Sequence, residues 1–344
     1  MTAPQEQVNA YSIADCNVLR IETYLYSVPQ VLNTLFWPGS RHPGPFHNRQ
    51  VPRNRFPTPK VQYDQQMEDV VMSKTSNRVS TREYLRLIGV PDLQPLTSPF
   101  DPGYDPVTLE GHLEQSAHLM STLKISMACW QIANEAATRR KIAAAQAHNV
   151  PTVTGGGPFE VAVAQGQLEA YLDLCADLGV TRIECGEGFT ELPFKPQVIV
   201  QMAHERGLAV QYEMGKKHEG PFTEESLEAA ISRGHRWLAA GAVQVVVEAR
   251  ERACGVGMFD SEGKLNVAFA DRFAQEFGLD VAVFEAPNKP SQFAFLEHFG
   301  PHVHLCNVRL EELLRVEIFR RGLHSDAFAM PNLRPTQPIS ETSS

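Results

Sequence analysis

From about residue 95, the chain alternates between short apolar runs and longer stretches in which apolar residues recur at helical spacing. The short apolar runs predict buried strands, and the stretches between them predict helices that cover a sheet. We expect strands at 95–100, 121–126, 150–154, 181–185, 208–213, 243–248, 280–285 and 302–307. We expect helices at 106–119, 130–148, 159–178, 195–206, 223–240, 265–277, 289–299 and 308–321.

Eight strand–helix units in about 230 residues predict an α/β fold of the (β/α)8 TIM-barrel type. The stretch 159–178 shows the expected spacing, with Val161, Leu168 and Leu172 among polar residues. Glycines that suit helix C-caps follow four of the stretches, at Gly207, Gly241, Gly278 and Gly300. A doubly wound open sheet is the alternative, but it would more often show a Gly-x-Gly-x-x-Gly turn after its first strand, and none is present there.

Four of the predicted strands end in a glutamate, namely Glu184, Glu213, Glu248 and Glu285, with spacings of 29, 35 and 37 residues. A charged group at the end of each buried strand is costly unless the strands converge on a polar site. In a β/α barrel, the carboxyl ends of the strands form the active-site rim. The glutamates therefore predict both the fold and a functional site.

Residues 1–94 differ from the barrel region, which we place at 95–330. Prolines and basic residues crowd the segment 37–60, so it is neither a helix nor the interior of a sheet. We interpret residues 1–94 as an extension that lies across the barrel or a neighbouring subunit, with a disordered tail or a basic lid as the alternatives. Short helices are expected at 17–35 and 80–88, and the polar segment 331–344 predicts a disordered tail.

Net charge, apolar content and cysteine spacing make several classes of protein unfavourable. A formal net charge of −9 makes nucleic acid an unfavourable partner, and no apolar stretch is long enough to span a membrane. The first residues lack the basic and apolar segments of a secretory signal. The six cysteines form no Cys-x-x-Cys pair, which is typical of reduced thiols in a cytoplasmic protein.

Further polar residues fall at or just beyond the predicted strand ends: Asp101, Lys124, Gly155, Gly156, Asn307, Lys216, Lys217, Arg250 and Lys289. Acidic and basic groups are present in nearly equal number, which indicates an anionic substrate held together with a divalent cation. Mg²⁺ binds carboxylate and phosphate oxygens together, and lysine and arginine bind phosphate or carboxylate. The glycine turn opens a helix and offers backbone N–H groups to an anion, although it also serves as a plain tight turn.

Five motifs follow one another along the chain: Thr154-Gly-Gly with Phe159-Glu160, Glu213-Met-Gly-Lys-Lys217, Val247-Glu248-Ala-Arg250-Glu251, Phe284-Glu285-Ala-Pro287, and Arg320-Arg321-Gly322-Leu323 with Asp326. In this order they resemble the motifs of the phosphosulfolactate synthase family. The resemblance covers about 95–328 and implies a β/α-barrel carbon–sulfur lyase that depends on Mg²⁺. It implies addition of sulfite to phosphoenolpyruvate, giving 2-phospho-3-sulfolactate on the route to coenzyme M or sulfolactate.

The chemistry implied by the resemblance assigns roles to these residues. Sulfite attack at the methylene carbon places negative charge on C2 and the carboxylate, and a lysine must then protonate C2. Lys217 is the first choice for this acid, with Lys216 and Lys124 as alternatives, and cationic neighbours are expected to lower its pKa. Arg250 and Lys289 would hold phosphate or sulfite. The four strand-end glutamates would bind metal or orient the lysines.

The chain departs from the family pattern around the first four strands. Asp101-Pro102-Gly103 replaces Asp-Lys-Gly, Ile125–Trp130 replaces Phe-Gly-Trp-Gly-Thr-Ser, and Gly186-Glu187-Gly188 replaces Ser-Asp-Gly. Two alternatives therefore stay open. One is a relative with a different nucleophile or enoate acceptor, and the other is a non-catalytic barrel with a stress-related or interaction role. Under each of these interpretations, the synthase included, we expect a homo-oligomer that binds small anionic substrates.

Overall fold

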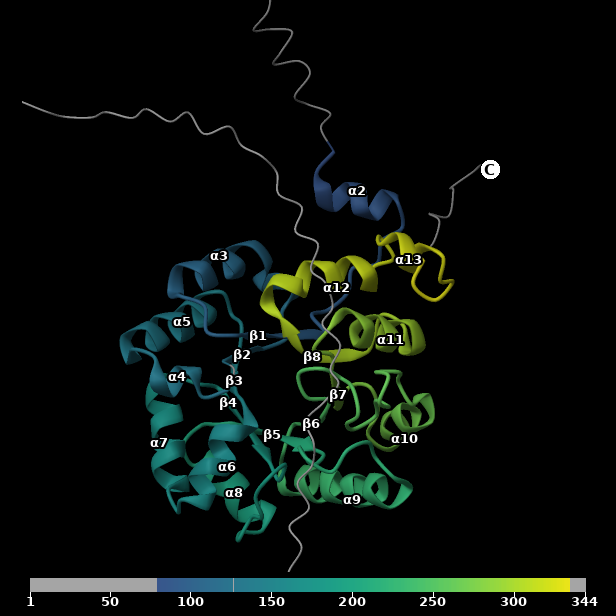
Figure 1. Ribbon diagram of the computed structural model, residues 1–344. Helices are drawn as coiled ribbons and strands as arrows, with labels where there is room; N and C mark the ends of the chain where they lie inside the picture. Colours follow the sequence, from purple (N-terminus) through teal and green to yellow (C-terminus); the bar gives the residue numbers. More distant parts are fainter. Residues whose placement is uncertain (1–78, 126, 335–344) are drawn as a thin grey trace, which may run out of the picture. The chain divides into compact units, whose positions relative to one another are not determined.

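The computed structural model describes residues 79–125 and 127–334, and its centre is a closed barrel of eight parallel strands (Figure 1). Neighbouring strands pair in sequence order, and β8 pairs with β1 to close the ring. The strands are β1 (Thr97–Asp101), β2 (Leu123–Ile125), β3 (Thr152–Thr154), β4 (Arg182–Gly186), β5 (Ala209–Met214), β6 (Gln244–Val247), β7 (Ala282–Glu285) and β8 (His304–Arg309). The predicted barrel is therefore confirmed, and the open doubly wound sheet is excluded.

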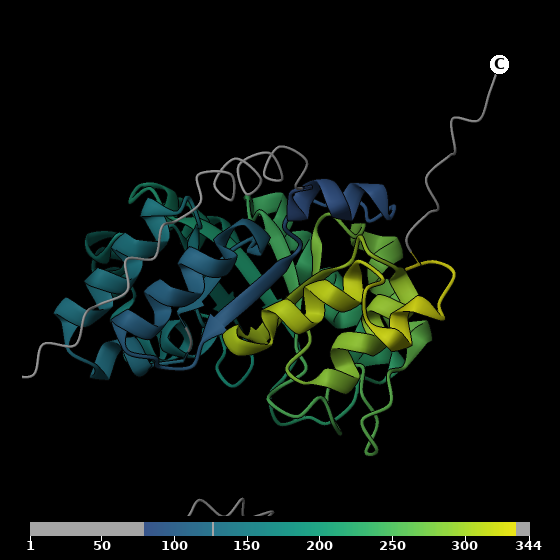
Figure 2. The ribbon, with the colours of Figure 1, turned by 90° about the horizontal axis from the view of Figure 1, so that it is seen from above.

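Helices surround this ring of strands, and the side view shows them as an outer layer (Figure 2). Within the described residues they are α2 (Thr81–Leu87), α3 (Pro106–Ser116), η2 (Ala117–Leu119), α4 (Cys129–Ile132), α5 (Glu135–Ala147), α6 (Gly156–Ala164), α7 (Leu168–Leu178), α8 (Pro196–His204), α9 (Glu224–Ala240), α10 (Val267–Phe277), α11 (Lys289–Phe299), η3 (Leu310–Glu312), α12 (Leu313–Arg320) and α13 (Ser325–Phe328). Each connection between successive strands carries at least one helix, as the β/α pattern requires.

Three predicted helices differ in their limits. The stretch 130–148 is two helices, because Asn134 caps the start of α5 with its side chain. The stretch 159–178 is also two helices, because Gly166 adopts a left-handed φ of 66° between α6 and α7. The stretch 308–321 begins as strand, since β8 continues through Arg309 and pairs there with Phe100 of β1.

The pleat of the strands decides which side chains enter the barrel. On β5, Tyr212 faces outward and stacks on Trp237 of α9, with ring centroids 4.7 Å apart. Successive side chains alternate between the two faces of a strand, so Gln211 and Glu213 face inward. Gln211 donates a hydrogen bond to Glu184 inside the barrel. The same alternation brings the strand-end glutamates to the interior at the carboxyl end.

The opposite end of the barrel is closed by a buried ionic network between α12 and the start of β1. Arg320 is fully buried and forms an ion pair with Glu317 at 3.1 Å. Its guanidinium also donates to the carbonyls of Pro301 and Val303, and Glu317 accepts from Thr97 Oγ1. The Arg320-Arg321-Gly322 motif is therefore a structural element at the β1–β8 closure, remote from the strand-end glutamates.

The structure describes only part of the N-terminal extension and of the C-terminal tail. The predicted helix at 80–88 is confirmed as α2, which Ser80 caps, whereas the one predicted at 17–35 lies outside the described residues. Of the predicted tail, residues 331–334 form turns with Leu333 buried, and the remainder is likewise outside. None of the helices in the described part of the chain combines the length and apolar character that a membrane crossing needs.

Candidate active site

The carboxyl ends of the strands open into a cavity of about 860 Å³. All four strand-end glutamates line this one cavity, which confirms the prediction that they face a common site. Their neighbours in the lining include Lys124 from β2, Asn307 from β8, Lys217 and Arg250 from the loops, and the glycine turn after β3. The rim thus gathers residues that are far apart in the sequence, as a barrel does.

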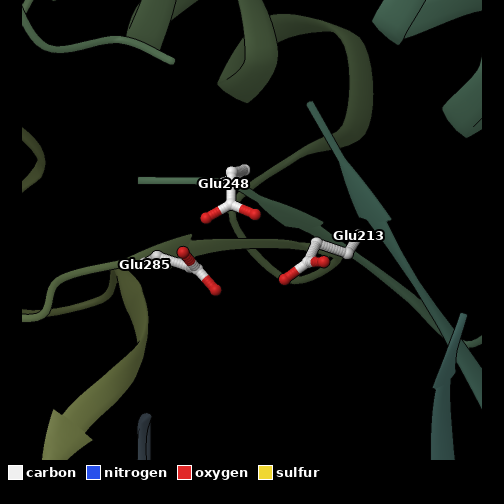
Figure 3. Close-up of side chains that lie close together, drawn as sticks. All are labelled: Glu213, Glu248 and Glu285. Atoms are coloured by element: carbon white, nitrogen blue, oxygen red, sulfur yellow. The ribbon is translucent and has the colours of Figure 1, made fainter. Parts of the chain in front are cut away.

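Three of the glutamates form a compact cluster, in which Glu213, Glu248 and Glu285 point toward one another from successive strand ends (Figure 3). Each offers a carboxylate oxygen, and these oxygens lie within 4.8 Å of one another. Glu213 Oε2 and Glu248 Oε2 are buried, and the ammonium of Lys217 lies 3.0 and 3.5 Å from them. Three carboxylates converge here, and carboxylate oxygens are the ligands that hard divalent cations prefer, so the cluster fits a divalent metal.

The cluster also separates the pKa values of its members. Burial raises the pKa of Glu285 well above 4.5, and the charges of Glu248 and Glu213 raise it further. Burial acts in the same direction on Glu213, but Lys217 and Lys124 outweigh it and lower the net pKa of Glu213. Of these two carboxyl groups, Glu285 therefore holds a proton more readily, and Glu213 is held ionised.

Glu184 stands apart from the cluster, because its carboxylate is already satisfied. Its Oε1 lies 2.8 Å from Lys124 Nζ and accepts from the N–H of Gly156 at 2.9 Å. Its Oε2 accepts from Gln211 Nε2 at 2.7 Å. With both oxygens engaged, Glu184 suits the orientation of Lys124 better than metal binding.

Lys124 is a buried cation at the bottom of the site. Its ammonium donates to Asn307 Oδ1 at 2.8 Å and lies 3.9 Å from Glu285. Asn307 in turn donates from Nδ2 to Glu285, and its φ of 54° turns its side chain to this position at the end of β8. Burial by itself lowers the pKa of Lys124, but Glu184 and Glu285 outweigh it, so the pKa is raised and the ammonium stays charged.

Lys217 lies directly beside the carboxylate cluster. Its Nζ is 3.0 Å from Glu213 Oε2 and 3.5 Å from Glu248 Oε2, and its side chain is 15% exposed. Burial lowers the pKa of Lys217, but the charges of Glu213 and Glu248 outweigh this and raise it. The expectation that cationic neighbours lower this pKa is therefore wrong, because the groups that surround the lysine are carboxylates.

A loop after β4 holds Lys217 in place, and sequence reasoning missed its anchor. The N–H of Lys217 donates to the carbonyl of Gly188 at 2.9 Å, and the side chain of Lys217 runs over Gly188. The next two residues, Phe189 and Thr190, donate their N–H groups to Glu160 Oε2 at 2.8 and 2.9 Å. Glu160 belongs to α6 and is fully buried, so it fixes the loop against which Lys217 rests. Its position next to Phe159 in a family motif was the available signal.

Comparison with known proteins identifies the family. A family model described as (2R)-phospho-3-sulfolactate synthase (ComA) matches residues 91–326. The chain belongs to this family. A phosphosulfolactate synthase of Methanocaldococcus jannaschii is 29% identical over 234 residues, covering 68% of this chain and 93% of that protein. The phosphosulfolactate synthase of Methanothermobacter thermautotrophicus is 27% identical over 248 residues, covering 71% of this chain and 95% of that protein.

A bacterial relative extends the similarity beyond the archaea. The phosphosulfolactate synthase of Bacillus subtilis is 29% identical over 189 residues, covering 55% of this chain and 75% of that protein. These relatives are named as synthases, so the comparison supports an enzyme. The matched region contains the whole barrel from β1 to α12, and with it every residue of the carboxylate cluster.

Part of the rim of this phosphosulfolactate synthase family member has unusual backbone conformations. Met127, Arg250 and Asn307 are non-glycine residues with φ between 47° and 57°, and all three line the cavity. Such conformations cost energy and persist where surrounding structure enforces them, often at functional sites. Arg250 also donates its N–H to Glu248 Oε1 at 2.7 Å. Gly155 and Gly156 also line the cavity, but the N–H of Gly156 donates to Glu184 and is not free for an anion.

Three predicted site residues lie outside the lining of this cavity. The carboxylate of Asp101 is buried, forms an ion pair with Lys141 of α5 and accepts from the N–H groups of Gly103 and Tyr104. Lys216 borders a separate, smaller cavity of about 150 Å³. Lys289 is exposed at the start of α11, with its ammonium over the ring of Phe293 at 5.0 Å. The structure therefore favours Lys217 and Lys124 as the lysines of the site.

Proposed function

We propose that the protein is a carbon–sulfur lyase of the phosphosulfolactate synthase type, which joins sulfite to phosphoenolpyruvate or a closely related enoate. The observation that carries the proposal is the position of Lys217, a charged ammonium 3.0 Å from a carboxylate cluster suited to a metal. An acid beside a cation site is the combination that protonation of a carboxylate-stabilised carbanion needs. Family membership supports the same reaction class.

The fit of the residues to Mg²⁺ rests on the cluster of Glu213, Glu248 and Glu285. Its three carboxylates bring oxygens within 4.8 Å of one another, and oxygen is the ligand that Mg²⁺ prefers. When bound there, Mg²⁺ would supply positive charge to the carboxylate of the acceptor. Glu184 is the least suitable of the four predicted metal ligands, because Lys124, Gln211 and Gly156 already occupy its oxygens.

Lys217 is the proposed proton donor. The sulfur lone pair of sulfite forms a bond to the methylene carbon, and the electrons of the C2–C3 double bond move to C2 and the acceptor carboxylate. The ammonium of Lys217 then gives one proton to C2 and becomes a neutral amine, which regains its proton from solvent. The raised pKa of Lys217 keeps the donor form populated at neutral pH.

The cations of the site are suited to hold the anionic groups of both substrates. Lys124 contributes a fixed charge at the bottom of the cavity, and Arg250 and Arg309 contribute guanidinium groups at its rim. Guanidinium groups bind phosphate or sulfite oxygens in a bidentate manner, and lysine binds them as a point charge. Lys289 would reach such a substrate only by moving, because it lies outside the lining. The homo-oligomeric state and the cytoplasmic location remain predictions.

The chain offers a matched pair of lysines for testing this function. Sulfite consumption would be followed with phosphoenolpyruvate and Mg²⁺ for the unchanged protein, for Lys217→Met and for Lys216→Met. We expect Lys217→Met to lower kcat by about 10²- to 10⁴-fold, the usual contribution of a general acid. Lys216→Met removes an adjacent charge outside the main cavity and should have a much smaller effect.

One outcome would refute the proposed reaction, and a second would refute the role of Lys217 in it. No turnover by the unchanged protein, together with no binding of phosphoenolpyruvate, would reject the reaction and favour a non-catalytic barrel. Turnover that survives Lys217→Met but is lost in Lys124→Met would keep the reaction and reassign the acid to Lys124.

A further inference from the structure

The large cavity has two chemically different walls. The wall from β5 to β8 carries the carboxylate cluster, Lys217 and the rim arginines. On the side from β1 to β4 and α6, Lys124 and Glu184 are buried at the strand ends, and the rest of the lining is mainly apolar, apart from Gln131. Its apolar members are Phe100, Pro102, Met127, Ala128, Pro158, Val161 and Phe189.

Three of these side chains are large, apolar and open to the cavity. Met127 is 52% exposed, Val161 is 53% exposed and Phe189 is 46% exposed. They come from three different segments, the turn after β2, helix α6 and the loop after β4, yet they line one cavity. Apolar side chains that gather over a polar site are typical of a surface that a ligand covers.

The size of the cavity points in the same direction. Phosphoenolpyruvate and sulfite together have about 14 non-hydrogen atoms, and would fill roughly 420 Å³ even at the ~30 Å³ that a water molecule takes in the liquid. The cavity measures about 860 Å³. About half of the space is therefore not needed by these two molecules.

The apolar wall is also held rigidly. Phe189 donates its backbone N–H to the buried carboxylate of Glu160 at 2.8 Å, and Val161 is the residue after Glu160 on α6. One buried side chain thus links the two segments that present Phe189 and Val161. A surface with a fixed shape binds without a large cost of ordering.

We infer that the acceptor is an enolpyruvate-type anion with an apolar substituent, whose charged end faces the carboxylate cluster and whose substituent lies on the wall of Met127, Val161 and Phe189. This inference rests on the proposed function, because it places the reacting carbons beside Lys217. It concerns the class of acceptor rather than the bond that forms.

Binding without sulfite separates this inference from the reaction itself. Calorimetry in the presence of Mg²⁺ would compare phosphoenolpyruvate with its derivative that carries a phenyl group on C3. We expect the phenyl derivative to bind at least tenfold more tightly, since apolar groups in such a wall change affinity by about 10- to 200-fold.

Variants of the apolar wall test whether this wall causes the tighter binding of the phenyl derivative. Phe189→Ser should lower the affinity for the phenyl derivative at least fivefold more than the affinity for phosphoenolpyruvate. Phe194→Ser is the matched control, because Phe194 follows in the same loop, is 44% exposed and does not line the cavity. Val161→Thr, an isosteric change on α6, gives a second variant if Phe189→Ser fails to fold.

Each outcome decides a different claim. Tighter binding of the phenyl derivative that is lost in Phe189→Ser or Val161→Thr, and kept in Phe194→Ser, supports the inference. Binding of phosphoenolpyruvate with equal or weaker binding of the phenyl derivative overturns it and leaves the proposed function intact. A gain in affinity that neither wall variant reduces also overturns it. Binding of neither compound rejects the proposed function as well.

Discussion

Replacing Gly188 by alanine perturbs the site at the point where Lys217 rests on the loop after β4. An alanine Cβ at position 188 would lie 2.6 Å from Cε and 2.7 Å from Cγ of Lys217. Ordinary contacts between carbon atoms are about 3.5 to 4.0 Å, so the lysine side chain must move by roughly 1 Å. A displacement of about 1 Å at a catalytic group costs on the order of 10²-fold in rate, or about 2.7 kcal/mol in the barrier.

The stability of the fold should change much less than the rate. The closest atoms belong to a flexible side chain, but the alanine Cβ would also lie 3.1 Å from Glu160 Oε1, so this carboxylate must shift by a few tenths of an ångström. Gly111→Ala is the control, because Gly111 lies on α3 and no described atom comes within 4 Å of a Cβ there. We expect Gly111→Ala to stabilise the protein by about 0.5 to 1 kcal/mol, with kcat unchanged.

The assay is the initial rate of sulfite consumption at saturating acceptor, with thermal unfolding measured on the same samples. We expect Gly188→Ala to retain its cooperative transition and to lose about 10²-fold in kcat. If kcat falls by less than about threefold while the variant is folded, then the position of Lys217 over Gly188 does not matter for the reaction.

Three further predictions address other parts of the site. Glu184→Leu should cost about 3 to 5 kcal/mol in urea unfolding, because it leaves Lys124 buried without its ion-pair partner. Arg140→Ala, which breaks an exposed pair, should cost much less, and similar losses in the two variants would contradict this. The raised pKa of Glu285 means that its contribution to stability without metal is complete below about pH 4.5 and is lost as pH rises through the raised value. Mg²⁺ must displace that proton, so calorimetry should show its affinity rising with pH by up to about tenfold per unit, and Glu285→Gln should flatten the slope. Glu160→Leu should lower kcat at least tenfold by freeing the loop, while Glu160→Gln, which keeps one oxygen acceptor, should retain more activity; equal losses would show that the charge rather than the hydrogen bonds matters.

The barrel and the four glutamates were predictable because their signals are local. Each strand is a short apolar run, and the glutamate at its end lies within the same few residues, so the parallel arrangement alone brings the four together. Which of the four glutamates cluster together, and which one pairs with Lys124, was not predictable. It depends on which partners arrive from elsewhere, such as Gln211 and Lys124 at Glu184.

Residues that are adjacent in the sequence can lie at different sites, because contacts with distant segments decide their positions. Lys217 turns into the site because its N–H binds Gly188 in a separate loop, while Lys216, one residue earlier, borders the smaller cavity. Asp101 forms an ion pair with Lys141, which is 40 residues away on α5, and does not line the cavity. Such long-range pairs leave no pattern in the local sequence, so the lysine pair and Asp101 could be placed only from the structure.

The central claim is that this cavity forms a carbon–sulfur bond and delivers a proton to C2 of the acceptor. Carbon NMR of phosphoenolpyruvate labelled at C3, incubated with the protein, sulfite and Mg²⁺ in D₂O, would test this directly. The account predicts that the C3 signal moves from the olefinic region to that of a carbon bonded to sulfur, with deuterium at C2 and the phosphate retained. An unchanged C3 signal with both phosphoenolpyruvate and its phenyl derivative, or release of phosphate without a carbon–sulfur bond, would contradict it.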